Sequence, residues 1–81
     1  MNKVKNFKEV VKQICNKEDL NVFDLSEKIG IGKTTLYCWI EGSSMPQISK
    51  IKKFAEVCGV DFEEVLRALT ESQILYSKKS K

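Results

Sequence analysis

The chain has 81 residues, which allow one domain with a modest core but not the paired lobes or large sheets from which most enzymes build a cleft. Charged residues make up 31% of it and apolar residues are spread along its length, which excludes a disordered tail and a fibrous protein. No stretch approaches the roughly 20 consecutive apolar residues that span a bilayer, and the lysine-rich start lacks the apolar block of a signal peptide. We expect a cytoplasmic domain that folds on its own.

The net charge of +3 is mild, but the charges are unevenly distributed. Lysines concentrate near the N-terminus, at Lys3, Lys5, Lys8, Lys12 and Lys17. Acidic residues concentrate before the C-terminal tail, at Asp61, Glu63, Glu64 and Glu71. One side of the molecule could therefore face a polyanion. Alternatively, the lysines only solvate the face of a helix.

The cysteine content argues against disulfides and against zinc. Cys15, Cys38 and Cys58 are odd in number and far apart, and the chain has no histidine. Neither a complete disulfide framework nor the spacing of zinc ligands is present. We expect reduced thiols, no metal and no cofactor.

The first predicted helix covers residues 4–15, where apolar residues recur at steps of three and four and so share one face. They are Val4, Phe7, Val10, Val11 and Ile14. The second begins at Asn21, an N-cap residue with Asp24 three positions later near the positive end of the helix dipole. Its buried residues are expected to be Val22, Leu25 and Ile29. It ends at Gly30, because glycine readily takes the left-handed conformation that closes a helix.

A third helix is predicted over Lys33–Glu41, with Gly32 as a weaker N-cap and Gly42 as its end. A turn of three residues, 30–32, separates it from the second helix. After a loop at 42–46, a fourth helix ends at Gly59. Its apolar residues are Ile48, Ile51, Phe54, Ala55 and Cys58.

A fifth helix follows Asp61, which with Glu64 three positions later resembles a capping arrangement. Its apolar residues are Phe62, Val65, Leu66 and Leu69. The pattern weakens beyond Thr70, so we place the domain at residues 1–70 and treat residues 71–81 as a C-terminal tail that could extend the last helix. No strand-like alternation competes with the helical period, and we predict an all-α fold of five helices.

The third helix has two different faces. At about 100° per residue, Leu36, Trp39 and Ile40 share one side, with the spacing of a buried stripe. The opposite side carries Thr34, Tyr37, Cys38 and Glu41, with Lys33 at the edge of the first turn. A short helix anchored along one face suits the major groove of DNA, whose width admits one helix. The polar side taken alone is also what a merely solvated helix would show.

One apparent motif does not hold. Residues 30–34, Gly-Ile-Gly-Lys-Thr, end like a phosphate-binding loop, but that pattern needs another glycine where this chain has Glu27. The segment also follows a predicted helix rather than a strand. No group of residues suggests a general base or a nucleophile, so we expect no enzymatic activity.

Two segments of the chain carry a recognisable pattern: residues 25–31 (Leu-Ser-Glu-Lys-Ile-Gly-Ile) and residues 35–42 (Thr-Leu-Tyr-Cys-Trp-Ile-Glu-Gly). They resemble, respectively, the second helix with its turn and the recognition helix of the phage-repressor/Cro family, also called the XRE-type helix-turn-helix family. The spacing of the family's fourth helix is matched by Pro46, Ile51, residues 54–56 and residues 58–60. The resemblance therefore extends over residues 21–66. It implies a compact, five-helix, lambda-repressor-like DNA-binding domain with the helix-turn-helix at 21–42.

The resemblance also implies a function and a site. The function is sequence-specific binding of double-stranded DNA by a transcriptional regulator, most simply a repressor from a mobile element or a bacterial operon. Bases in the major groove would be read by Lys33, Thr34, Tyr37 and Cys38. Phosphates would be bound by Lys28, Ser43, Ser44, Gln47, Ser49 and Lys50. These side chains offer the donors, charge and apolar surface that such contacts require.

The sequence departs from the family pattern at three positions. Val22 stands where the family usually has a phosphate-binding glutamine, Ile40 stands where it usually has an acidic residue, and Cys38 is a less common reader. Cys38 is either a passive small side chain or a site of oxidation. The departures keep open an alternative: a protein-binding module of the same fold, such as an antitoxin-like protein or a partner of a larger regulator. Its contact residues would be Val22, Tyr37, Ile74, Leu75 and Tyr76.

The C-terminal tail is the expected site of self-association. One helix reads only a few base pairs, so we expect a homodimer on a palindromic operator. The tail region holds more apolar surface than a solvated segment needs, at Leu69, Ile74, Leu75 and Tyr76. The alternative is that these residues pack back onto the first helix.

Overall fold

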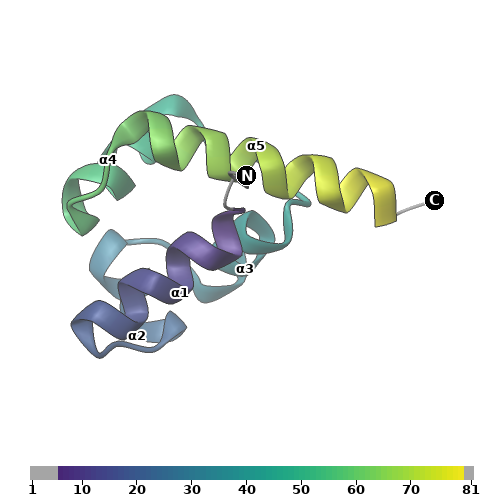
Figure 1. The fold of residues 1–81 in the computed structure, drawn as a ribbon. Helices are drawn as coiled ribbons and strands as arrows, with labels where there is room; N and C mark the ends of the chain where they lie inside the picture. Colours follow the sequence, from purple (N-terminus) through teal and green to yellow (C-terminus); the bar gives the residue numbers. More distant parts are fainter. Residues whose placement is uncertain (1–5, 80–81) are drawn as a thin grey trace.

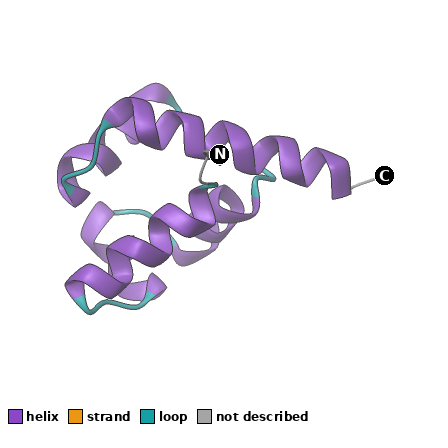
Figure 2. Cartoon of the chain, viewed as in Figure 1, coloured by secondary structure: helices purple, strands orange, loops and turns teal. Residues whose placement is uncertain are grey.

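Five α-helices and their connecting turns make up residues 6–79, the part of the chain that the computed structural model describes (Figures 1 and 2). In chain order they are α1 (Phe7–Glu18), α2 (Val22–Ile29), α3 (Lys33–Glu41), α4 (Ile48–Cys58) and α5 (Phe62–Lys79). The helix α5 packs against α1, α3 and α4, and α2 packs against α1, α3 and α4. The all-α, five-helix fold expected from the sequence is confirmed.

Side-chain caps explain where three of the helices begin. Asn6 and Asn21 each accept a hydrogen bond from the backbone N–H three residues later, at 2.9 and 2.8 Å, and each belongs to a reciprocal capping box. The Asp61 carboxylate accepts from the Glu64 backbone N–H at 3.2 Å. The caps predicted at Asn21 and Asp61 are confirmed.

The predicted bounds of the first helix were wrong at its C-terminal end. The helix α1 continues past Cys15 to Glu18 and closes at Asp19, whose φ of 56° lies in the left-handed region. No apolar residue follows Cys15 within the helix, and Asp19 is not the glycine that usually marks such an end. Val4, the first residue of the predicted stripe, lies outside the described residues.

One apolar cluster forms the core, in which the rings of Phe7 and Phe54 are in contact, with their centroids 5.1 Å apart. Its buried members come from all five helices: Phe7, Val10, Val11, Ile14, Leu25, Ile29, Leu36, Trp39, Ile51, Phe54, Ala55, Cys58, Val65, Ala68 and Leu69. Ile48 shares the helical spacing of the apolar residues of α4 but is not part of the core; it is the first residue of α4 and is 61% exposed, because the helix starts beyond the edge of the cluster. Val22 and Ile40, which were predicted to be buried, are only partly buried at the margin of the core. Phe62 and Leu66, two apolar residues of α5, lie at the same margin.

The helix α5 continues without a break through Thr70, where the sequence pattern weakens, to Lys79. Just beyond Thr70, Ser72 is 3% exposed, and its hydroxyl accepts a hydrogen bond from the Phe7 backbone N–H at 2.8 Å, which ties this part of α5 to the start of α1. Beyond this contact, the last turns of α5 extend past the other helices (Figure 1). The middle of α5 thus belongs to the core, and its end does not.

Gly42 and Gly59 provide a matched test of this packing. Both have left-handed backbones, but a Cβ on Gly42 would lie 2.2 Å from the Ser72 carbonyl oxygen, whereas a Cβ on Gly59 would meet nothing within 4 Å. Gly59→Ala should therefore cost only the left-handed strain, about 1 kcal/mol. Gly42→Ala adds overpacking and should cost about 2–4 kcal/mol. Urea unfolding of both variants measures the difference, and equal losses would contradict the contact.

Candidate nucleic-acid interface

The turn between α2 and α3 is held by backbone hydrogen bonds. The N–H groups of Gly30 and Ile31 both donate to the Ser26 carbonyl oxygen, at 2.9 and 3.0 Å. Gly30 has a φ of 90°, which lets the chain reverse within the three residues 30–32. Ile31 packs against the core cluster. These contacts fix the start of α3 relative to α2.

One face of α3 is an anchor. Leu36 is fully buried and Trp39 is 3% exposed, while Ile40 is partly buried against the cluster. The helix packs on α1, α2 and α5, and its end at Gly42 abuts the backbone of α5 at Ser72. The orientation of α3 is therefore set at both ends and along its length. This arrangement leaves only its opposite face for a ligand.

The opposite face is open to solvent. Lys33, Thr34 and Tyr37 are exposed, and the exposed fraction of Tyr37 is 49%. Cys38 is only partly exposed, and its backbone carbonyl accepts the N–H groups of Gly42 and Ser43. The four predicted base-reading residues thus share one side of α3, with Cys38 more enclosed than the others. Gly32 provides no side-chain cap, so the N-terminal N–H groups of α3 are not bonded to a cap side chain.

Most of the predicted phosphate-binding residues lie together. They are Ser43, Ser44, Gln47, Ser49 and Lys50, all exposed within the loop after α3 and the first turn of α4. Gln47 is the N-cap of α4 but makes no side-chain cap bond. The positive end of a helix dipole and its free N–H groups favour an anion at this place. The segment 43–50 follows directly on α3, so both sets belong to one continuous stretch of chain.

Lys28 does not join this group. Its ammonium forms an ion pair with Glu18 at the end of α1, and the hydrogen bond to that carboxylate raises the pKa of Lys28. The Lys28 charge also acts to lower the pKa of the Cys58 thiol, which lies at the C-terminal end of α4. Ser49 and Lys50 lie at the opposite, N-terminal end of that helix. The structure therefore brings the other phosphate candidates together without Lys28.

Two exposed residues were not in the predicted site. Phe23, in the first turn of α2, is 50% exposed, and Thr35 is exposed beside the Thr34 that the sequence singled out. Phe23 lies off the Val22, Leu25 and Ile29 stripe, so the helical period could have identified it as a surface aromatic residue. Val22, in the position of the family's glutamine, packs at the margin of the core.

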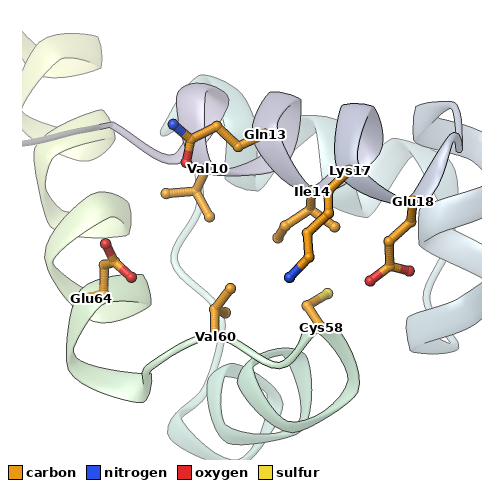
Figure 3. A pocket seen from close by; sticks show the side chains of 8 residues that line it. All are labelled: Val10, Gln13, Ile14, Lys17, Glu18, Cys58, Val60 and Glu64. Atoms are coloured by element: carbon orange, nitrogen blue, oxygen red, sulfur yellow. The ribbon is translucent and has the colours of Figure 1, made fainter.

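A small pocket lies on another part of the molecule, between α1 and the junction of α4 with α5 (Figure 3). Its volume is about 170 Å³, and its lining residues are Val10, Gln13, Ile14, Lys17, Glu18, Cys58, Val60 and Glu64. Burial raises the pKa of the Cys58 thiol from 9.0 to about 11, with the Glu18 charge adding to it, so this sulfur stays protonated and is a poor nucleophile. Burial also raises the pKa of Cys15. Within residues 6–79, no three His, Cys, Asp or Glu side chains come together as a metal site would require.

A family model described as "Helix-turn-helix" matches residues 11–65, more than half of the chain. The chain therefore belongs to the XRE-type, phage-repressor/Cro family of helix-turn-helix proteins, as the sequence resemblance predicted. It is a DNA-binding regulator with a lambda-repressor-like fold. No curated protein and no solved structure gives a significant match to it. Within the described part of the chain, every helix is too short or too polar to cross a membrane.

The two faces of α3 can be separated by substitution. Thr34→Ala and Tyr37→Ala should leave the free energy of unfolding nearly unchanged, because both side chains are exposed, but should cost about 1–3 kcal/mol of preference for the operator over a mutated site. Trp39→Ala removes a core side chain and should cost about 3–5 kcal/mol of stability. Denaturant unfolding and competition gel shifts measure the two quantities.

Trp39→Phe serves as a milder variant if Trp39→Ala does not fold. It should lower stability while keeping the ratio of operator to non-operator affinity. Equal loss of stability and of specificity in the variants at positions 34, 37 and 39 would contradict the assignment of faces.

Proposed function

We propose that the protein represses transcription by binding a short palindromic operator as a dimer, with α3 inserted in the major groove. The observation that carries this proposal is the contrast between the two faces of α3: Leu36 and Trp39 are buried, whereas Lys33, Thr34 and Tyr37 are open to solvent. A helix held on one side and free on the other can present base-reading groups at a fixed angle. Repression would follow where the operator overlaps a promoter.

Base readout is assigned to Lys33, Thr34, Tyr37 and Cys38. Phosphate contacts are assigned to Ser43, Ser44, Gln47, Ser49 and Lys50, which follow α3 directly and surround the uncapped start of α4. Phosphate contacts set the register of the protein on the duplex, and base contacts choose the sequence. Lys28 is not included, because its charge is already paired with Glu18.

The second candidate is binding of another protein through the same surface. It is favoured by two aromatic side chains exposed near the helix-turn-helix, Phe23 and Tyr37, and by the low net charge of +3. An apolar contact of this kind would depend weakly on salt. Binding to DNA depends strongly on salt because lysines that neutralise phosphates release counterions.

A salt titration with three lysine variants therefore decides between the candidates. Affinity for mixed-sequence duplex DNA should fall steeply with salt, with a slope of about −0.9 in log–log form for each phosphate neutralised. Lys50→Gln should reduce this slope by about 1, because Lys50 is assigned to a phosphate. Lys33→Gln, at a base-reading position, should instead relax the preference for the operator over other sequences. Lys28→Gln is the matched control and should leave the slope unchanged, since Lys28 is paired with Glu18. Absence of salt-dependent binding would contradict the DNA proposal and favour the protein-binding module.

Dimerisation is assigned to the end of α5. This end extends beyond the other helices (Figure 1) and exposes Ile74 at 45% and Leu75 at 39%. Burial of these apolar side chains against a second copy would remove them from water and stabilise a dimer. The two copies would be related by a two-fold axis, which is also the symmetry of a palindromic site. Tyr76 is partly buried. Ser72 is bonded to Phe7 within the protomer and is not assigned to the dimer interface.

A double substitution, Ile74→Ser with Leu75→Ser, tests this assignment without removing Ser72. It should lower cooperative binding to an operator with two half-sites and leave binding to one half-site nearly unchanged. Arg67→Ser, at another exposed position of α5, is the control and should preserve cooperativity. Sedimentation and gel-shift titrations give both quantities. Unchanged cooperativity in the double variant would contradict a dimer interface at this end of α5.

A further inference from the structure

The chemistry of the open face of α3 limits which bases it can read. Guanine is usually recognised by arginine or lysine, adenine by asparagine or glutamine, and thymine by apolar contact with its C5-methyl group. The nine residues of α3, Lys-Thr-Thr-Leu-Tyr-Cys-Trp-Ile-Glu, include no arginine, asparagine or glutamine. Lys33 is their only basic residue. The helix therefore has one candidate for guanine and none for a bidentate contact with adenine.

The positions that face away from Leu36 and Trp39 offer apolar groups. Thr34 carries a methyl group, Tyr37 carries an aromatic ring with half of its surface exposed, and Cys38 carries a small thiol. These three positions lie on one side of the helix, opposite the buried Leu36 and Trp39. The one acidic residue of α3, Glu41, lies in its last turn, whereas recognition helices contact bases mainly through their N-terminal residues.

We propose that this protein recognises its operator chiefly through the C5-methyl groups of thymines, which contact Thr34, Tyr37 and Cys38, with Lys33 binding one guanine. The inference rests on the proposed function, since it names the base chemistry read by the same face. The partner is a thymine-containing half-site of double-stranded DNA. A thymine methyl enters a small apolar surface formed by these side chains and leaves water, which is favourable without any hydrogen bond to the base.

The first step of the test is selection of bound half-sites from a random duplex library with the full chain. The second step replaces each thymine of the selected half-site by deoxyuridine, which removes the C5-methyl group and keeps every hydrogen-bonding group of the base. Each contacted methyl should be worth about a four-fold change in affinity, which corresponds to about 0.8 kcal/mol. We expect this loss at two or three positions of the half-site.

Paired variants of Thr34 separate its methyl group from its hydroxyl. Thr34→Val keeps a methyl group and should retain the four-fold discrimination of thymine from deoxyuridine. Thr34→Ser keeps the hydroxyl and should lose that discrimination at one position. Tyr37→Ala should lose it at a different position. Because all three residue changes are at exposed sites, the fold is retained.

The outcomes distinguish this inference from the function on which it rests. A library that yields no enriched sequence contradicts DNA recognition itself. An enriched half-site that lacks thymine, or one that tolerates deoxyuridine at every position, overturns methyl recognition and leaves sequence-specific binding intact. Loss of discrimination in Thr34→Val but not in Thr34→Ser would assign the contact to the hydroxyl and overturn the proposal at that position.

Discussion

The close approach of Gly42 to the backbone of Ser72 is the contact on which the rest of the arrangement depends. At this point the end of α3 meets the middle of α5, and the Ser72 hydroxyl also accepts the first N–H of α1, from Phe7. Three helices are thereby fixed against one another where any side chain on residue 42 would separate them. Leu36 and Trp39 then bury the inner face of α3, and its outer face has one orientation only. A rigid position of this kind is what base recognition requires of a helix.

Electrostatics favours a division of labour on the binding surface. Within α3, the charge of Lys33 is balanced by Glu41, so the helix itself carries little net attraction for DNA. Hydroxyl, amide and ammonium groups follow it in residues 43–50, next to the positive end of α4. In the proposed complex, attraction to the phosphate backbone would come mostly from the segment after α3, and discrimination between bases from α3. Lys28 is paired with Glu18, so its charge is not assigned to the phosphate backbone; the pair joins α1 to α2 instead.

Local signals in the sequence were sufficient for most of the fold. Helical periodicity distinguished the buried Trp39 from the exposed Tyr37. Asn21, Gly30 and Gly42 marked helix ends through their own capping and backbone preferences, which do not depend on distant parts of the chain. The rest depends on contacts between segments far apart in the chain. Ser72 is a polar residue whose burial arises from a hydrogen bond to a residue 65 positions away, and the Lys28–Glu18 pair joins two helices, so neither leaves a periodic signal. Ile48 shows a different limit of the sequence pattern: it has the helical spacing of the buried residues of α4 but is exposed, because spacing alone does not show where the core ends.

The central claim is that the open face of α3, with the segment that follows it, contacts DNA. The most direct measurement is a titration of ¹⁵N-labelled protein with a duplex selected from a random library, followed by amide chemical shifts. The account predicts the largest changes in residues 33–38 and 43–50, with small changes in the part of α1 that packs in the core. Changes concentrated in α1 or at the end of α5, with residues 33–38 unaffected, would contradict it.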